Sequence, residues 1–349
     1  MVLQIGCIGV GGLGYFQCKT LSELEDVSII GAADVTEEAR TLFEEEFSSP
    51  SYEHYRMLLQ EHADELDAVV IVTPHTLHHE QAMAALKQDL HVLVEKPMVT
   101  EIDDAVDLVE TAAERELVLQ VGYQRHFHPA FEEIRRILHN GRIGDVHTVN
   151  CYLGQDWIEP HRDTWRGDVS MSGGGQLYDT GSHMLDALLW TTEAQPRTVA
   201  AEMDFAEPGI DVNSSLSARL DRGGDSIITS VSISGDGVET DITEGYSYWG
   251  SEGRLTFSDG RIEVAEKNAV TYTTEITEET DFQTLTGKKM RNFVESIQGI
   301  AEPAVPGEVG LRVTALTEAA YLSAEEGKRV EVQPLIESAR EERTDGYHS

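Results

Sequence analysis

Two stretches of the sequence carry ionisable side chains with the chemistry to handle the proton of an alcohol. The first is VLVEKPM, an apolar run that ends in Glu95, Lys96 and Pro97. A lysine ammonium at such a tip can hydrogen-bond a hydroxyl and stabilise the negative charge that develops on its oxygen. Pro97 would fix the turn that follows the run. The alternative is a solvated lysine that is ion-paired with Glu95.

The second stretch is GGGQLYDTGSHMLDALLW, residues 173–190. Asp179 and His183 are four residues apart, so they lie on one face if the segment is helical. A histidine with a neighbouring carboxylate is the usual general acid–base arrangement near neutral pH, and Asp179 could orient the imidazole. The alternative is a pair on a helix surface with no catalytic role. Asp186 could cap the helix or pair locally.

A third motif, GVGGLG at residues 9–14, has the pattern GxGxxG between a strand-like and a helix-like run. Its first glycine allows a tight turn, the second lets the backbone approach a pyrophosphate, and the third allows close packing of helix and strand. About 20 residues later, Asp34 ends the second strand-like run. A carboxylate there accepts hydrogen bonds from both ribose hydroxyls and repels a 2′-phosphate. NAD is therefore favoured over NADP, although Arg40 could still swing in.

The elements that must position these motifs alternate between strand and helix over the first 122 residues. The strand-like runs are nearly all apolar, as in strands buried on both faces. They lie at residues 3–9, 27–34, 67–73, 91–96 and 117–122. Amphipathic stretches of helical length separate them, which predicts an α/β fold with a doubly wound parallel sheet of the Rossmann type.

Ligands of such sheets bind outside the carboxyl ends of the strands, so Lys96 and Thr73-Pro74-His75 are expected at one edge. A polar contact from His75 or His78 to the rim of the cofactor is predicted there. No metal is expected, because neither cysteine nor paired carboxylates complete a site around these histidines. The three cysteines of the chain are widely spaced, which disfavours disulfides and zinc.

The pattern changes after about residue 144. Residues 225–235 alternate strictly, with Ile227, Thr229, Val231 and Ile233 on one face, and Asp259-Gly260 is a two-residue hairpin signal. Helical periods return at residues 288–300 and 308–327. The sequence predicts a Rossmann domain at 1–122, an α/β domain with a mainly antiparallel sheet at 123–337, and a frayed polar tail at 338–349.

The charge is strongly acidic, with 63 acidic and 26 basic residues and a formal net charge of −37. Such a field repels nucleic acid and anionic membrane. The acids are scattered through the chain, which favours a surface adapted to high salt over an acidic interaction tail. No apolar stretch reaches the roughly 20 residues of a membrane span. These features predict the cytoplasm of a halophile.

Together the motifs resemble those of the Gfo/Idh/MocA oxidoreductases, which include glucose–fructose oxidoreductase and inositol dehydrogenases. The resemblance runs in order through IGCIGVGGLG, TPHTLHHEQAMAALKQDLHVLVEKPM, LQVGYQRHFHP, TWRGDVSMSGGGQLYDTGSHMLDALLW and AVPGEVGLRVTALTEAAYLSAEEGKRVEV. It implies a C-terminal domain with a large open sheet, and homodimers or homotetramers that pack through that sheet.

The resemblance also implies the site residues. It makes Lys96, Asp179 and His183 catalytic, with His183 as the base that takes the hydroxyl proton. The predicted cofactor contacts are Gly9, Gly11, Gly12, Leu13, Gly14, Asp34, Thr73, Pro74, His75, His78, Glu95, Lys96, Gln124, Trp165 and Arg166. The predicted substrate contacts are Lys96, Tyr123, Arg125, Trp157, His161, Asp179 and His183.

The expected function is hydride transfer between NAD and a secondary alcohol or hemiacetal carbon of a sugar or cyclitol. In this scheme the cofactor carries the redox chemistry and the protein supplies position and electrostatics. Two alternatives stay open: a redox-neutral NAD-dependent glycosidase, and a sensor that binds the dinucleotide without turnover. The intact set of Lys96, Asp179 and His183 argues against the sensor, which needs no proton-transfer pair.

Overall fold

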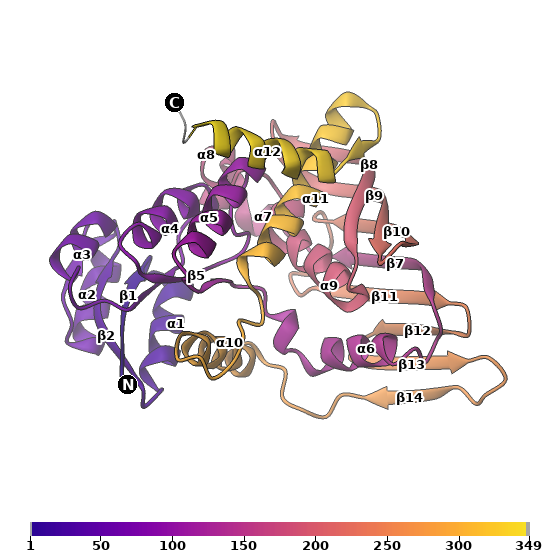
Figure 1. Ribbon diagram of the computed structural model, residues 1–349, viewed down its shortest axis with the longest axis horizontal. Helices are drawn as coiled ribbons and strands as arrows, with labels where there is room; N and C mark the ends of the chain where they lie inside the picture. Colours follow the sequence, from indigo (N-terminus) through magenta and orange to yellow (C-terminus); the bar gives the residue numbers. More distant parts are fainter. Residues whose placement is uncertain (1, 347–349) are drawn as a thin grey trace. The chain divides into compact units, whose positions relative to one another are not determined.

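The computed structural model describes residues 2–346 and contains two compact units, each built around its own sheet. The first unit comprises the chain up to Val99 together with Asp104–Gln124 and Asp281–Leu311. The second comprises Thr100–Asp103, Arg125–Thr280 and the chain from Arg312 onward. Figure 1 labels the elements along the chain.

The first unit is a six-stranded sheet in the order β3-β2-β1-β4-β5-β6, with every neighbouring pair parallel. Its strands are β1 Leu3–Ile8, β2 Val27–Ala33, β3 Ser51–Tyr52, β4 Ala68–Ile71, β5 His91–Val94 and β6 Leu119–Val121. Its helices are α1 Gly12–Ser22, α2 Glu37–Phe47, α3 Tyr55–Glu61, η1 His75–Leu77, α4 His78–Leu86, α5 Ile102–Glu114 and α10 Phe282–Ile297. The predicted Rossmann arrangement is confirmed.

Helix α10 belongs to the first unit although it comes late in the chain. Its Met290, Phe293 and Val294 are fully buried in one apolar cluster with residues of β1, α1 and β2. The expected assignment of all of residues 123–337 to the second domain therefore differs from the structure, in which residues 281–311 return to the Rossmann unit. The sequence pattern showed an amphipathic helix there, but periodicity does not tell which sheet a helix covers.

The second unit is a nine-stranded sheet in the order β14-β13-β12-β11-β7-β10-β9-β8-β15. Its neighbours are antiparallel except for the parallel pair β10 and β7. The strands are β7 Val146–Gly154, β8 Gln195–Glu207, β9 Ile210–Arg222, β10 Asp225–Ser234, β11 Thr243–Gly250, β12 Gly253–Ser258, β13 Arg261–Glu266, β14 Tyr272–Glu275 and β15 Val330–Glu331. This confirms the expected large, mainly antiparallel sheet.

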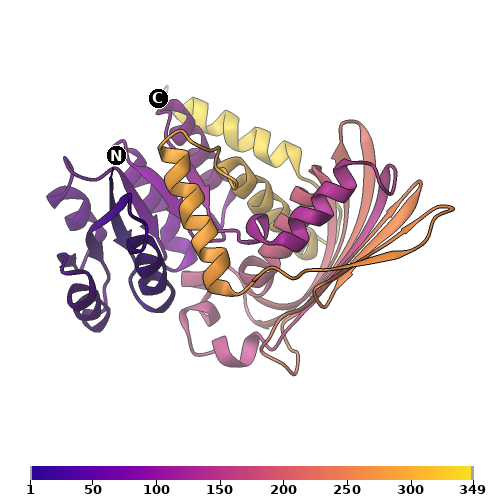
Figure 2. The same cartoon turned by 90° about the horizontal axis from the view of Figure 1, so that it is seen from below.

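The helical segments of this unit are short or lie along the sheet. They are η2 Arg125–Phe127, α6 Pro129–His139, α7 Ile158–His161, η3 Trp165–Gly167, α8 Val169–Ser172, the π-helical η4 Leu177–Gly181, α9 Ser182–Thr192, α11 Gly307–Glu326, of which the unit holds the part from Arg312, and α12 Gln333–Gly346. Helices α6 and α9 pack on one face, and Figure 2 shows no helix over the opposite face within the described residues.

The alternation in β10 is confirmed, because Ile227, Thr229, Val231 and Ile233 are buried while the serines between them are exposed. The hairpin signal is confirmed as well, since Asp259-Gly260 joins the antiparallel strands β12 and β13 with positive φ at both residues. The expected frayed tail at 338–349 is wrong for residues 338–346, because they belong to helix α12. Residues 347–349 lie outside the described part. No described helix is long and apolar enough to cross a membrane.

Candidate functional site

The glycine loop between β1 and α1 has the geometry that the motif predicts. Gly9 has a φ of +84°, and a Cβ there would lie 2.3 Å from the carbonyl oxygen of Val72. A Cβ on Gly14 would lie 1.9 Å from the carbonyl oxygen of Gly9, so the helix approaches the strand only with glycine. A Cβ on Gly12 would meet nothing within 4 Å. The loop thus presents open backbone at a helix N-terminus, which fits the pyrophosphate of a dinucleotide.

The carboxylate of Asp34 is bound to this loop. Its Oδ2 accepts hydrogen bonds from the backbone N–H of Val10 and of Gly11, at 2.8 and 3.1 Å. Its Oδ1 accepts one from the N–H of Thr36 at 2.8 Å, and the guanidinium of Arg40 donates to the Asp34 carbonyl at 2.8 Å. Asp34 therefore lies beside the glycine loop, as expected, with Arg40 next to it.

His78 links two strand tips of the first unit. Its Nε2 lies 2.9 Å from the carbonyl oxygen of Thr73, and its Nδ1 lies 2.8 Å from that of Pro97. Burial lowers the pKa of this imidazole, although both carbonyls favour its protonated form. His75 is also buried, and no group of described residues is arranged to hold a metal ion. His78 thus ties the turn after Lys96 to the neighbouring strand.

Glu95 is buried beneath the Lys96 tip. Its Oε1 accepts hydrogen bonds from the ammonium of Lys289 on α10 and from Nε2 of Gln17 on α1, the latter at 2.6 Å. Its Oε2 accepts the backbone N–H of Lys96 at 3.2 Å. Burial raises the pKa of Glu95, but the charge and hydrogen bond of Lys289, the hydrogen bond from Gln17 and the charge of Lys96 together outweigh burial and lower the pKa. This carboxylate, predicted as a cofactor contact, is held by two helices of its own unit.

The residues that follow β6 also contact other residues of the unit to which each belongs. Tyr123 is fully buried, and Gln124 donates from Nε2 to the hydroxyl of Thr286 at 2.9 Å. In the second unit, Arg125 is 9% exposed and forms an ion pair with Glu244 at 2.7 Å. Burial lowers the pKa of Arg125, but nearby groups, the Glu244 carboxylate foremost, raise it overall. These contacts hold side chains that were predicted to bind substrate or cofactor.

In the second unit, two of the predicted residues donate hydrogen bonds to Asp179. Its Oδ2 accepts the indole N–H of Trp157 at 2.8 Å and Nε of Arg166 at 3.0 Å. The Arg166 guanidinium lies over the ring of Trp165, 4.3 Å from its centroid. Trp157 is fully buried, and its ring meets that of His161 edge to face. Trp157 and Arg166, which lie on separate segments, are therefore joined at Asp179.

Asp179 and His183 lie on one continuous helical segment, but it is not α-helical throughout. Asp179 belongs to the π-helical turn Leu177–Gly181, and His183 lies in the first turn of α9. Asp179 is 5% exposed, whereas His183 is partly exposed between buried neighbours. π-Helical turns inside helices are often found at functional sites. The spacing argument assumed a regular helix here and did not foresee this local widening.

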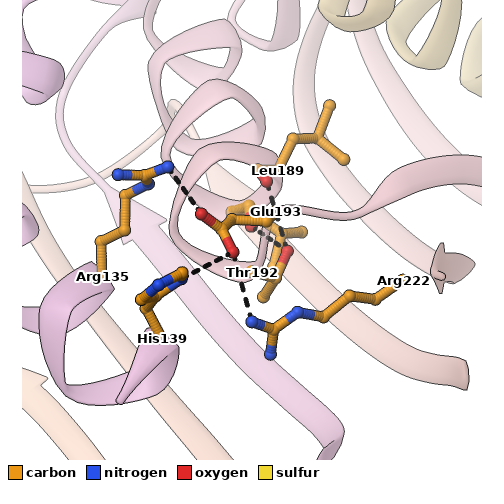
Figure 3. A network of polar contacts seen from close by, with 7 residues as sticks. Arg135, His139, Leu189, Thr192, Glu193 and Arg222 are labelled. Carbon is orange, nitrogen blue, oxygen red and sulfur yellow. Dashed lines mark hydrogen bonds and ion pairs between the residues drawn. The ribbon is translucent and has the colours of Figure 1, made fainter. Parts of the chain in front are cut away.

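The C-terminal end of α9 is fixed by the ion pairs of Figure 3. Glu193 ends the helix with a φ of 54°, and its Oε1 accepts Nη2 of Arg135 on α6 at 2.6 Å. Its Oε2 lies 3.3 Å from Nδ1 of His139 and 3.3 Å from Nη2 of Arg222 on β9. Burial raises the pKa of Glu193, but His139 and Arg135 outweigh it and lower the pKa. The helix that carries His183 is thus bound to both α6 and the sheet.

The predicted residues therefore form two groups, one in each unit. The glycine loop, Asp34, Thr73, His78 and the Lys96 tip lie at the carboxyl ends of the parallel strands, and Asp179 with Trp157, Arg166 and His183 forms the second group. Sequence reasoning missed Gln17, Lys289 and Glu244, which hold predicted residues from distant segments. A lysine on the apolar face of an amphipathic helix was the available signal for Lys289.

Two family models match the chain. The one described as "Oxidoreductase family, NAD-binding Rossmann fold" matches residues 3–123. The one described as "GFO/IDH/MocA C-terminal domain" matches residues 131–256. Together they account for more than two thirds of the 349 residues.

Curated relatives and solved structures match as well. Glucose-6-phosphate 3-dehydrogenase of Bacillus subtilis (strain 168) is 24% identical over 58% of this chain and 57% of its own length, so the chain spans little more than half of that relative. D-xylose 1-dehydrogenase (NADP(+)) 2 of Haloferax volcanii is 24% identical over 95% of this chain and 100% of that protein. The solved structure of levoglucosan dehydrogenase in complex with NADH and L-sorbose aligns with a TM-score of 0.85 at 19% identity, covering 95% of this chain and 98% of that one.

Proposed function

Since the chain belongs to the Gfo/Idh/MocA oxidoreductase family, we propose that it is an NAD-dependent sugar or cyclitol dehydrogenase. The reaction is oxidation of a secondary alcohol or hemiacetal carbon, or the reverse reduction. The observation that carries the proposal is the partly exposed His183, one helical turn after the buried, multiply bonded Asp179, in a chain that also has a dinucleotide-type glycine loop.

In the proposed mechanism, the glycine loop and Asp34 would hold NAD, which would supply the hydride acceptor for the alcohol carbon. His183 takes the hydroxyl proton as general base and returns it in the reverse direction. Lys96 donates a hydrogen bond to a substrate oxygen and stabilises negative charge that develops on it. Asp179, held by Trp157 and Arg166, supplies a fixed negative charge near the base.

The test begins with NADH formation by the purified protein across aldoses, inositols and sugar acids, in multimolar KCl because of the acidic composition. Lys96→Ala and His183→Ala should each lower kcat by about 10²- to 10⁴-fold, the usual worth of general acid–base groups. NAD affinity, measured by fluorescence titration, should change little. Loss of NAD binding with turnover retained contradicts these roles. Hydrolysis of a glycoside without net NADH favours the redox-neutral alternative, and ligand binding without any turnover favours the sensor.

We propose NAD as the preferred cofactor because the Asp34 carboxylate lies beside the glycine loop, where it repels a 2′-phosphate. The adjacent Arg40 guanidinium is the group that could accept NADP. The ratio of kcat/KM for NAD to that for NADP should fall in Asp34→Ala. An unchanged ratio removes Asp34 from the ribose site.

We propose further that the protein is a homodimer or homotetramer in the cytoplasm of a halophile, with the open face of the nine-stranded sheet as the contact. This face is lined by small polar side chains such as Ser215, Ser230 and Ser232, and it carries a hollow of about 540 Å³. An open sheet face with small side chains fits sheet-on-sheet packing. Light scattering should report more than one chain for the wild type and a smaller particle for Ser230→Arg. A single-chain mass for the wild type contradicts the proposal.

A further inference from the structure

The loop that leads into the His183 helix is bound by a single residue of β9. Three consecutive backbone N–H groups donate to Asp211: that of Gly175 to Oδ1, that of Gln176 to the main-chain carbonyl, and that of Leu177 to Oδ2, each at 2.9 Å. The first residues of a helix have no intrahelical acceptors for their N–H groups. Asp211 therefore supplies, from another element, the acceptors at the start of the π-helical turn.

The Asp211 carboxylate is itself held by hydroxyl groups. The hydroxyl of Tyr321 on α11 donates to Oδ1, and that of Ser214 donates to Oδ2 at 3.1 Å. The Tyr321 oxygen also accepts the N–H of Gly175 at 3.1 Å. Asp211 is fully buried, so these hydrogen bonds replace those it would make with water. The loop, β9 and α11 are thereby joined at one point.

The glycines of the loop are explained by this close approach. A Cβ on Gly175 would lie 2.0 Å from the backbone oxygen of Asp211 and 2.5 Å from its nitrogen. A Cβ on Gly174 would lie 2.2 Å from the ring of Tyr178 and 2.6 Å from the hydroxyl oxygen of Tyr321. No other residue type fits at these contacts. The sequence GGG is therefore matched to Asp211 and Tyr321 as well as to the turn.

We propose that Asp211 and Tyr321 are positioning residues for the reaction, because they fix the start of the segment on which Asp179 and His183 are carried. This inference rests on the proposed dehydrogenase function. Asp179 lies two residues after the last amide that Asp211 binds. A rotation of the first turn shifts both catalytic side chains, and a misplacement of about 1 Å can cost about 10²-fold in rate. The far end of the helix is fixed separately by Glu193.

The first experiment compares Tyr321→Phe with the matched control Tyr248→Phe. Tyr321→Phe keeps the ring and removes only the hydroxyl that holds Asp211. Tyr248 is fully buried and shares a hydrogen bond of 3.0 Å with Thr191, so its substitution removes a comparable hydroxyl within the same unit. Tyr321→Phe removes a hydrogen bond to a buried carboxylate, so it should lose more thermal stability than Tyr248→Phe. Turnover is therefore compared at a temperature at which both variants are fully folded, so that a difference between them is due to the loop.

We expect Tyr321→Phe to lower kcat by about 10- to 100-fold, to alter the pH dependence of kcat, and to leave the affinity for NAD unchanged. Tyr248→Phe should keep wild-type kcat. Amide hydrogen exchange over residues 173–183 should become faster in Tyr321→Phe alone. Equal kcat in the two variants, or equal exchange of the loop, overturns the proposal.

Asp211→Asn provides a second test with the same side-chain volume. An amide nitrogen replaces one carboxylate oxygen and faces a backbone N–H donor, so one hydrogen bond from the loop is lost. We expect a larger loss of kcat than in Tyr321→Phe and the same local increase in hydrogen exchange. If the wild type turns over no sugar or cyclitol, the dehydrogenase proposal fails, whereas the exchange data still decide whether Asp211 and Tyr321 hold the loop.

Discussion

Each unit contains a buried carboxylate that holds a predicted catalytic segment, and the two carboxylates are satisfied in different ways. Glu95 holds the Lys96 tip and is paired with the ammonium of Lys289. Asp211 holds the loop before Asp179 and is bound by backbone amides and by the hydroxyls of Tyr321 and Ser214. We call these two carboxylates the anchors of their segments. The Glu95 anchor is paired with a full opposite charge, and the Asp211 anchor is held by the dipoles of N–H and O–H groups.

The pKa values of the two carboxyl groups follow this difference. Burial raises the pKa of both, but at Glu95 the charge and hydrogen bond of Lys289, with smaller contributions from Gln17 and Lys96, together reverse the effect and lower the pKa. At Asp211 burial prevails over the hydrogen bonds from Tyr321 and Leu177, and its pKa is raised. The ion pair therefore keeps Glu95 ionised, whereas hydrogen bonds alone leave Asp211 easier to protonate.

The largest effect is expected when the charge pair is broken. Lys289→Met keeps the length of the side chain but leaves Glu95 buried without its cation, which should cost about 3–5 kcal/mol in the free energy of unfolding. Urea unfolding in constant KCl measures it. The double variant Glu95→Gln/Lys289→Met should recover much of the loss, since a neutral pair has no uncompensated charge. A single variant as stable as the wild type would show that the pair does not carry the anchor.

Each anchor has a glycine packed against it, and the two contacts differ. Substituting these glycines should change the free energy of unfolding less than breaking the charge pair does. A Cβ on Gly122 would lie 2.7 Å from the carboxyl group of Glu95, a side chain that can shift. A Cβ on Gly175 would lie 2.0 Å from the backbone of Asp211, which cannot. Gly122→Ala should cost about 1–3 kcal/mol in unfolding free energy, as overpacking usually does, and Gly175→Ala should cost more. The reverse order contradicts this assignment.

The sequence predicted well the segments that the two carboxylates hold. In a parallel sheet the strand ends share an edge, so local motifs were enough to place Asp34, Thr73 and Lys96 together in the first unit. In the second unit the spacing of Asp179 and His183 placed them on one face on condition that the segment is helical. These features depend on residues close to one another along the chain.

The residues that hold these segments, by contrast, come from distant parts of the chain. Lys289 lies 194 residues from Glu95, and Asp211 lies 36 residues from Gly175. Helical periodicity marks Lys289 as facing the core but does not name its partner. Asp211 sits at the start of a strand, where an isolated acidic residue has no distinctive pattern. The π-helical turn is set by these contacts, so local propensity did not reveal it.

The smallest expected effect is the pH dependence of each anchor's contribution to the free energy of unfolding. It has opposite signs for the two anchors. The folded pKa of Glu95 is lowered, so its contribution to stability is present above its unfolded pKa of about 4.3 and is lost as pH falls below it. The folded pKa of Asp211 is raised, so its contribution is present below its unfolded pKa of about 3.9 and is lost as pH rises through the folded value.

Unfolding free energies measured from pH 7 down to pH 3.5 should show both trends. The stability advantage of the wild type over Glu95→Gln should shrink toward the acid end, because the ion pair with Lys289 is lost on protonation. The advantage over Asp211→Asn should grow over the same range, because protonation removes the cost of burying the Asp211 charge. Parallel curves for the two variants would mean that both carboxylates are satisfied in the same way, and the contrast between a charge-paired and a dipole-held anchor would not hold.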